Sequence, residues 1–477
     1  MQFRKYTLTL IFTACSIFAY AQQDTTLSLQ QCLDIAIKNN LNVKQNGLLM
    51  MQDNIYLNQA KENLLPSISG NASRQLSQGR GLSPVTNTYV NQSLTSDNYG
   101  VNGSLTIFNG LALQNAIKQA SLAYQAGKMD FQAAKDQVTV NVIINYLSIL
   151  DGQEILNASK SQLAVAKENV DRSEVLEKDG ANKLASDLTD FRGAYAGAQV
   201  AMVQAQNSVD AAKLSLFQLL AIPYNKAVRF QPLNAQDLTG EYGANADQVY
   251  QTALQTLAQV KAATLRRESA EKGVKVAKGQ LYPTLSVNGG INTNYSSAGT
   301  KSVFIDSVTN AVPGLFVNTP SGKQAVFSTS ANNASQNISY SDQFKNNYGT
   351  YVQLGLNIPI FTNHIKKNNV ALAKINLLNE QYIEENTKVQ LKQSVEQAYY
   401  NMSAAFNRYQ SLKTQVEAYT ESYRIGKIRL DAGVITSVDF IIAENNLNAA
   451  TLNLISARYD YFIYSKVLDY YQGKLSF

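Results

Sequence analysis

Two long stretches of the chain carry apolar residues in alternating steps of three and four. Each stretch continues for ten positions without interruption, which is the sustained heptad pattern of a helix that packs along one face. The pattern predicts helices over about 188–219 and 440–471. The apolar positions are Leu188, Phe191, Tyr195, Ala198, Met202, Ala205, Val209, Ala212, Leu216 and Leu219 in the first stretch, and Phe440, Ala443, Leu447, Ala450, Leu454, Ala457, Tyr461, Tyr464, Leu468 and Tyr471 in the second.

Each of these helices follows another long helical region. Proline is absent from residues 85–222 and 360–477, so nothing in these regions interrupts a helix. Residues 110–178 alone would extend on the order of 100 Å as a helix. Turns between the long helices then predict two antiparallel helical hairpins, with tips near 179–186 and 432–438.

Other segments alternate between apolar and polar residues with a period of two. This pattern is typical of membrane β-strands with one apolar and one polar face. It occurs at 101–107, 285–292 and 352–358. Polar segments rich in Ser, Asn and Thr, at about 78–98 and 296–347, are predicted to be exposed loops.

The chain is internally duplicated. One ungapped alignment matches Leu64–Ser69 with Leu281–Ser286, and each match lies at the end of a predicted helix that a proline terminates. Ser28 and Asn245 are N-cap residues, each followed three positions later by Gln, as in a capping box. We therefore predict helices over 28–65 and 245–282 and two structural repeats, 22–244 and 245–477, each with a helix, two strands and a hairpin; an equatorial linker ends the first repeat.

The N-terminus has the pattern of a secretory signal peptide. Arg4 and Lys5 precede a short apolar run, and a small-x-small site ends at Ala21, so we predict a cleaved signal peptide over 1–21. Lipid attachment at Cys15 is not expected, because the apolar run continues past it. Cleavage would leave Cys32 as the single cysteine. The formal charge of +6 is scattered among acidic residues, so nucleic acid is not an expected partner.

Four strands in one chain are too few for a closed membrane barrel, which needs at least about eight. An open sheet edge cannot face lipid, because its backbone groups would lack hydrogen-bond partners. The strands are therefore expected to be completed by other copies of the chain. The predicted fold class is an α+β membrane protein, in which four strands per chain contribute to a composite trimeric β-barrel that continues into a long α-helical coiled-coil tunnel.

The chain resembles the TolC family of outer-membrane efflux proteins. The resemblance rests on the duplicated Leu-Leu-Pro-Ser-Ile-Ser and Leu-Tyr-Pro-Thr-Leu-Ser motifs, the strand-to-helix corners at 105–110 and 356–361, and the hairpin tip at 433–444. It implies a homotrimer in the outer membrane, in contact with outer-membrane lipid, whose helical tunnel lies in the periplasm of a Gram-negative cell. It also implies a passive exit duct that works with a periplasmic membrane-fusion adaptor and an inner-membrane pump of the RND or ABC type.

The resemblance also implies a narrowed periplasmic entrance, formed by Asp residues just after each hairpin tip. By position these are Asp187 and Asp439, with Asp190 one turn beyond Asp187. A ring of such carboxylates would favour cations. The alternative is structural: an acid in the first turn stabilises the helix dipole, and Ser186 or Ser437 is a candidate N-cap.

The tips also depart from the family pattern. Ile435 and Leu430 replace an Arg and a Tyr, and Ile442 replaces a second acid, so any constriction would rest on carboxylate repulsion and apolar contact. Gly180 and Gly433 fit left-handed positions that end helices. The candidate contacts with the adaptor are Gly180, Ala181, Gly433, Val434 and Ile435.

No catalytic site, cofactor site or metal site is expected. The single histidine, His364, and Cys32 have no further ligands grouped with them in the sequence. Two alternatives to an efflux duct stay open: the outer-membrane component of a type I protein secretion system, and a periplasmic coiled-coil scaffold without a pore. The alternating strands argue against the scaffold.

Overall fold

The computed structural model describes residues 26–82, 87–178, 185–232 and 242–474. The predicted signal peptide, Cys15 and the tip residues Gly180 and Ala181 lie outside these ranges. The chain forms two compact units, one mainly helical (residues 1–57, 119–271 and 375–477) and one containing the long strands (58–118 and 272–374). Each unit therefore combines parts of both predicted repeats; the boundary between the repeats stays a prediction.

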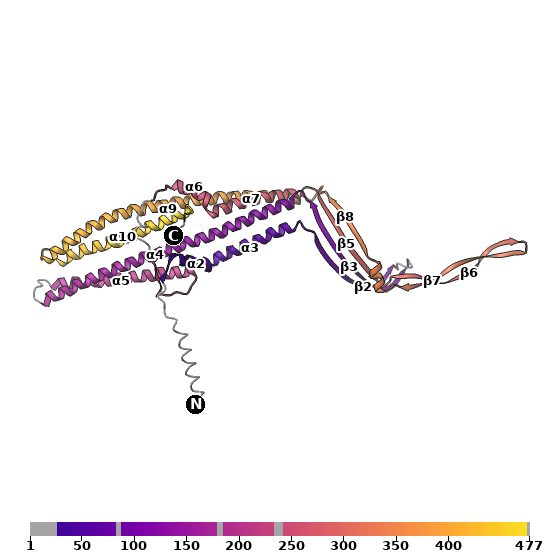
Figure 1. Ribbon diagram of the computed structural model, residues 1–477, viewed down its shortest axis with the longest axis horizontal. Coiled ribbons are helices and arrows are strands. Elements are labelled where there is room, and N and C mark those ends of the chain that lie inside the picture. Colours follow the sequence, from indigo (N-terminus) through magenta and orange to yellow (C-terminus); the bar gives the residue numbers. More distant parts are fainter. Residues whose placement is uncertain (1–25, 83–86, 179–184, 233–241, 475–477) are drawn as a thin grey trace, which may run out of the picture. The chain divides into compact units, whose positions relative to one another are not determined.

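Two helical hairpins dominate the first unit (Figure 1). In the first hairpin, α4 (Ala112–Lys178) is followed by α5 (Ala185–Leu220); in the second, α9 (Ile365–Asp431) is followed by α10 (Ser437–Tyr471). Both outgoing helices have 67 residues. The predicted apolar stripes are confirmed, because all of their positions on α5 and α10 are buried or half-buried.

The shorter helices predicted over 28–65 and 245–282 each consist of two helices. The first region contains α2 (Leu29–Asn39) and α3 (Leu41–Glu62), and the second contains α6 (Ala246–Thr256) and α7 (Ala258–Gly279). The single-helix prediction was wrong because Asn40 and Leu257 adopt extended ψ angles of 125° and 130°. The predicted capping boxes are confirmed at both starts, on Ser28 with Gln31 and on Asn245 with Gln248.

A small parallel sheet braces the middle of the helical unit. It pairs β1 (Thr26–Leu27) with β4 (Arg229–Phe230). The buried Tyr146 hydroxyl on α4 donates to the Gln231 carbonyl oxygen at 2.7 Å, and the Leu27 carbonyl oxygen lies 3.2 Å from the same hydroxyl. The buried Lys213 ammonium donates to the Val228 carbonyl at 2.8 Å. The polar groups of both side chains therefore have partners inside an apolar core, where an unpaired group would be costly.

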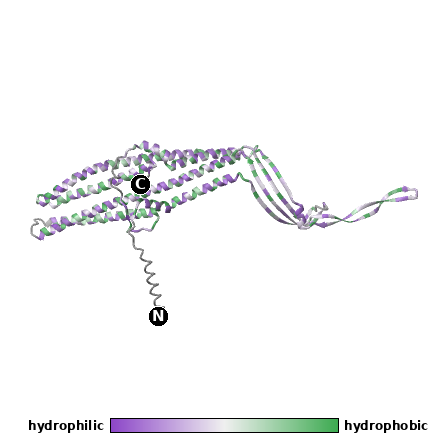
Figure 2. Ribbon diagram, in the orientation of Figure 1, coloured by the Kyte–Doolittle hydropathy of each residue, from purple (hydrophilic) through white to green (hydrophobic). Residues whose placement is uncertain are grey.

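The second unit contains a four-stranded antiparallel sheet in the order β2-β3-β5-β8. Its strands are β2 (Ser67–Leu82), β3 (Tyr89–Phe108), β5 (Thr284–Ser296) and β8 (Gly349–Asn357). The two repeats meet in the centre, where β3 pairs with β5 and Gly103 lies opposite Gly289. Figure 2 shows apolar and polar residues alternating along these strands.

The segments predicted as polar loops are mostly regular structure. β2 and β3 stay paired from Ser67 with Ser104 to Leu82 with Tyr89, so much of 78–98 is strand. Residues 296–347 contain a second antiparallel pair, β6 (Thr300–Thr319) and β7 (Gly322–Asn337), followed by α8 (Tyr340–Asn346). The loop prediction was wrong because it relied on the Ser, Thr and Asn content of these segments. The strand pattern of β6 was not recognised, because register shifts after Phe304 and after Ala311 interrupt its alternation of apolar and polar residues.

A tight corner joins the strands to the long helix of the first repeat. Gly110 has a φ of 66°, and a Cβ there would lie 2.4 Å from the Gly279 carbonyl oxygen. A Cβ on Gly279 would in turn lie 2.9 Å from that of Ala112. Only glycine fits both positions, since this conformation and this close approach exclude a side chain.

Candidate functional site at the hairpin tips

Asp439 caps its own helix. Thr436 is the N-cap of α10, and its hydroxyl accepts from the Asp439 amide at 3.2 Å. The Asp439 carboxylate accepts in return from the Thr436 hydroxyl at 2.8 Å and from its amide at 3.3 Å. This capping box satisfies two amides that the first turn of a helix leaves unpaired. The suggestion that Ser437 caps α10 was therefore wrong by one residue.

Ser437 instead joins the two hairpins. Its buried hydroxyl lies 2.6 Å from the Asp187 carboxylate and 3.1 Å from the Asp190 carboxylate. Both acids are on the first turns of α5, so one side chain of the second hairpin contacts two of the first. A hydroxyl has one hydrogen to donate. The two carboxylates therefore compete for it, and Asp187 is the nearer acceptor.

Ion pairs add to this contact. The Arg172 guanidinium on α4 binds the Asp431 carboxylate at the end of α9 at 2.5 Å. Arg192 on α5 pairs with Glu174 on α4 at 2.9 Å, within the first hairpin. Because these side chains are about half exposed, solvent and salt screen the attraction and each pair stabilises the structure only slightly. Their geometry nevertheless fixes which surfaces of the helices face each other.

An apolar cluster lies beneath the polar contacts. Phe440 of α10 is almost fully buried, and its ring centroid lies 5.4 Å from that of Tyr423 on α9. Leu430 and Ile435, the residues that depart from the family pattern, pack against this cluster. The two hairpins of one chain therefore share an apolar contact near the tips, whereas apolar contact at a constriction of the duct stays a prediction. Its buried members are Val170, Leu188, Phe191 and Phe440.

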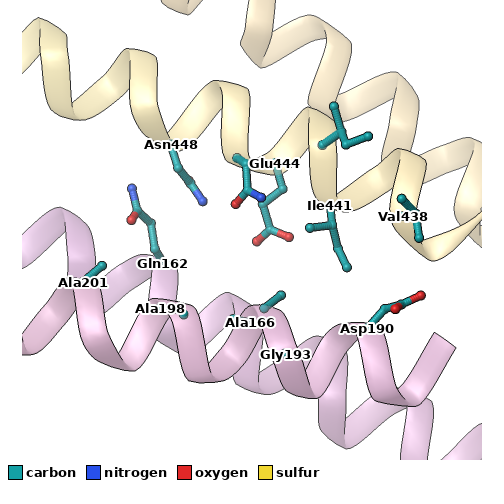
Figure 3. A pocket seen from close by; sticks show the side chains of 14 residues that line it. Gln162, Ala166, Asp190, Gly193, Ala198, Ala201, Val438, Ile441, Glu444 and Asn448 are labelled. Atoms are coloured by element: carbon teal, nitrogen blue, oxygen red, sulfur yellow. The ribbon is translucent and has the colours of Figure 1, made fainter. Parts of the chain in front are cut away.

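A groove of about 510 Å³ runs between the hairpins next to this cluster (Figure 3). Apart from Asp190, its α5 wall consists of Gly and Ala residues, and a Cβ added to Gly193 or Gly197 would meet no atom within 4 Å. Its α10 wall is formed by Val438, Ile441, Ile442, Glu444, Asn445 and Asn448. The groove is therefore open beside α5, because Gly193 and Gly197 have no side chains to fill it.

Glu444 is the buried charge of this groove. Its carboxylate accepts a long hydrogen bond of 3.4 Å from the Asn169 amide. Burial raises the pKa of the Glu444 carboxyl above its usual range, and the nearby Lys427 opposes that shift. The groove therefore offers a partner a buried carboxyl, that of Glu444, beside the polar side chains of Gln162 and Asn448 and a wall of small residues.

The structure places the sequence-predicted residues in different environments. Asp187 and Asp190 are brought together by Ser437, whereas Asp439 is exposed and serves as a cap. Gly433 has the expected left-handed φ of 72°, and its amide donates to the Leu430 carbonyl at 2.9 Å. Val434 is exposed, whereas Ile435 is half-buried.

Arg172, Asp431 and Glu444 belong to this site but could not be predicted from the sequence. The heptad pattern does not distinguish an exposed charge from one that contacts another hairpin, so it carried no signal for these residues.

The four-stranded sheet has one apolar and one polar face, as predicted. The register aligns Leu105 with Val287 and Leu354 on one face. On the other face, the Ser67 and Ser104 hydroxyls lie 2.7 Å apart. Further along that face, Asn102 donates to Asn71 at 3.0 Å and accepts from the Tyr351 hydroxyl at 3.2 Å. Hydrogen bonds between side chains therefore line the polar face.

Among the described residues, no helix has the length and apolarity needed to cross a membrane. Within the same part of the chain, no three His, Cys, Asp or Glu side chains are placed to bind a metal ion together.

Several solved structures are similar to this chain. The CmeC outer membrane channel of Campylobacter jejuni has 19% sequence identity and a TM-score of 0.72, and the match covers 94% of this chain and 86% of that chain. For the outer membrane protein VceC of Vibrio cholerae the values are 14% and 0.70, with 93% of this chain and 94% of that chain covered.

The MtrE outer membrane channel of Neisseria gonorrhoeae, in its open state, has 17% identity and a TM-score of 0.66, with 94% of this chain and 89% of that chain covered. These likenesses establish the fold. No curated protein matches the chain in sequence.

A family model described as "Outer membrane efflux protein" matches two stretches, residues 32–221 and 249–471. Each stretch lies within one of the two predicted repeats, and together they cover most of the chain. The match confirms the resemblance to the TolC family that the strand-to-helix corners and the hairpin tip indicated. The chain belongs to the outer membrane efflux protein family.

Proposed function

We propose that three copies of this chain form a passive exit duct of a tripartite efflux system, carrying substrates from an inner-membrane pump and a periplasmic adaptor to the outside. The observation that supports this most is the four-stranded sheet. One of its faces is apolar and exposed, the other is polar, and in the described residues its edge strands β2 and β8 have no further partner. Such a sheet suits lipid on one face and water on the other once copies close it.

The exposed apolar face supports placing the sheet in lipid. Val352, Leu354 and Leu356 on β8 and Ile291 on β5 are all exposed in the single chain. In water such a continuous apolar face would be an aggregation hazard. In a bilayer it is the surface that the hydrocarbon requires. The helical hairpins, in which the described residues contain no helix apolar enough to cross a membrane, are proposed to lie in the aqueous periplasm.

The groove between the hairpins is proposed as the docking site of the periplasmic adaptor. Gly193 and Gly197 leave room for a helix to approach α5 closely, and Glu444 provides a buried acceptor for a polar group of that helix. The exposed Gly433 and Val434 lie at the adjacent tip and are proposed to contribute to the same contact. Gly180 and Ala181 are proposed contacts as well.

A matched pair of variants tests the docking groove. Gly197→Leu fills the groove and should weaken binding of a purified adaptor to the duct by at least about tenfold, which corresponds to about 1.4 kcal/mol. Gln199→Leu places the same side chain on an exposed position of α5 outside the groove lining and should leave binding unchanged. Equal binding of the adaptor by the parent protein and by both variants would rule out the groove as the docking site.

The gate is proposed to lie at the same tips. In this proposal Asp187 and Asp190 narrow the entrance while Ser437 holds them, and Arg172 with Asp431 keeps the hairpins together. Asp439, on the exposed side of its capping box, adds charge at the second tip. Three copies around an axis would triple each charge, and such rings attract cations.

Conductance in a planar lipid bilayer tests both the duct and its gate. The parent protein should form channels, and Asp187→Ala combined with Asp439→Ala should raise their conductance or weaken block by multivalent cations. Channels with unchanged conductance and block would remove the gate assignment but leave the duct. Failure of every variant to form channels would contradict the duct itself.

A further inference from the structure

Among the described residues, the β6–β7 hairpin has no counterpart in the first repeat, where β2 ends at Leu82 and β3 begins at Tyr89. β6 begins four residues after the last residue of β5, Ser296. This is the end of β5 opposite to the one that follows α7. Twenty residues of strand would extend roughly 65 Å at about 3.3 Å per residue. In the described part of the chain, β6 and β7 pair only with each other.

The base of this hairpin is fixed rather than loosely attached. The buried Gln343 side chain of α8 accepts from the Ser296 amide at 2.9 Å and donates to the carbonyl oxygens of Ser296 at 2.9 Å and Ile338 at 3.1 Å. A Cβ on Gly299 would lie within 2.7–2.9 Å of the same side chain. A buried amide with this many partners holds the two ends of the hairpin against the last residue of β5.

Contacts with β3 also hold the base. Ser297 and Thr95 exchange two hydrogen bonds, with the Ser297 amide donating to the Thr95 carbonyl at 2.9 Å and the Thr95 amide donating to the Ser297 hydroxyl at 3.0 Å. The Tyr340 hydroxyl donates to that of Tyr99 at 2.8 Å. The direction of the hairpin is therefore set by the sheet.

Three phenylalanines lie on one face of the hairpin. The register places Phe327 opposite Ala311, Phe316 opposite Ala325 and Phe304 opposite Asn333, all at positions that point to the same side. Their side chains are 63%, 58% and 60% exposed. Ser328, one residue after Phe327, points to the other side.

This hairpin needs a partner. An isolated pair of strands is at best marginally stable in water, and long unpaired edges with exposed apolar residues invite association. Its charged residues are Lys301, Asp306 and Lys323. Such a small and mixed charge provides little attraction for an anionic surface and little repulsion between copies of the hairpin.

We propose that the phenylalanine faces of the β6–β7 hairpins from neighbouring copies pack against one another beyond the outer end of the barrel. This inference rests on the trimeric duct proposed above. The occupant is a second copy of this chain, because the hairpin continues from a sheet whose edges β2 and β8 also require copies. Association among copies buries the three phenylalanine rings and gives each two-stranded hairpin the further packing that an isolated pair of strands lacks.

Cross-linking of single-cysteine variants tests the proposal in the full-length protein. Phe327→Cys places a thiol on the phenylalanine face, and Ser328→Cys places one on the opposite face as a matched control. The predicted mature chain has only Cys32 besides, which is fully buried and whose pKa burial raises to about 12, so it does not compete. Membranes containing each variant are treated with a short bismaleimide, and the oligomer is measured separately by native mass spectrometry.

The expected result is that most Phe327→Cys protein forms covalent dimers, whereas Ser328→Cys protein stays largely uncross-linked. An intact trimer without cross-links in Phe327→Cys would overturn the hairpin contact and leave the duct standing. Equal cross-linking of both variants would overturn the assignment of the face. A monomer in the mass measurement would overturn the proposed function together with this inference.

Discussion

The two repeats build the same scaffold but differ at its ends. Both have a pair of short helices broken at one residue, two strands in the shared sheet and an outgoing helix of 67 residues. At the tips, Asp187 and Asp439 are each the third residue of a returning helix. Asp439 completes a capping box with Thr436, whereas Asp187 contacts Ser437 of the other hairpin. At the far end of the strands, only the second repeat carries the β6–β7 hairpin. The repeated parts provide rigidity, and the parts that differ carry the specific contacts.

The largest expected effect tests whether the returning helices are equally important for stability. Leu216 on α5 and Leu468 on α10 occupy the same position of the two stripes and are fully buried. Replacing either with Ala should lower the free energy of unfolding by about 3 kcal/mol, because it removes buried methyl groups and leaves a cavity. Chemical denaturation followed by circular dichroism measures this. Leu214→Ala, at an exposed position of α5, is the control, and an equal loss there would contradict the packing.

The second prediction concerns the contact between the hairpins. Ser437→Ala removes the hydroxyl shared by Asp187 and Asp190, and leaves two carboxylates facing an apolar methyl group. We expect a local loss of about 2 kcal/mol, since hydrogen bonds to charged groups are stronger than neutral ones. Hydrogen exchange of amides in the first turns of α5 and α10 should accelerate together. Acceleration confined to α10 would show that Ser437 serves its own helix only.

A pH effect is expected in the first hairpin, at Asp151 of α4. Burial, then the neighbouring Asp460 and Glu154, raise the pKa of the Asp151 carboxyl to about 6, although Arg458 opposes the shift. In the described part of the chain, one of its buried oxygens has no hydrogen-bond partner. Residue 404, at the same position of α9, is Ala.

A raised carboxyl pKa stabilises the fold below the unfolded value near 4, and this contribution is lost as the pH rises through 6. Asp151→Asn should therefore be more stable than the parent at pH 8, by about 1 kcal/mol after discounting for solvent, with the difference vanishing below pH 4. Unfolding curves at several pH values measure it. A difference that does not change with pH would contradict ionisation as the cause.

The smallest effect is expected at the cap. Asp439→Ala breaks the capping box on Thr436 and should cost about 0.5–1 kcal/mol, confined to the first turn of α10. Hydrogen exchange at the α10 amides detects it. Faster hydrogen exchange at the α5 amides as well would mean that Asp439 also stabilises the first hairpin. The two tips would then not differ in whether their Asp contacts the other hairpin.

The sequence predicted the repeated scaffold well, because heptad stripes, capping boxes and alternating strands are local patterns. It did not predict the breaks at Asn40 and Leu257, where neither Gly nor Pro signals a change of ψ. The β6–β7 hairpin was also missed, since two irregularities interrupt its alternation and its composition is typical of loops.

At the candidate site, the sequence located the acids but not their partners. Ser437 and Arg172 acquire their roles only when the two hairpins are brought together, and no pattern within one helix encodes that contact.

We propose that each chain forms one third of the duct, and that the sheets of three copies together close the barrel. Native mass spectrometry of the full-length protein extracted in detergent tests it most directly. We expect a complex of three chains. A stable single chain that stays soluble when the detergent is removed would contradict it, because the apolar face of the sheet and the edges of β2 and β8 would then need no covering.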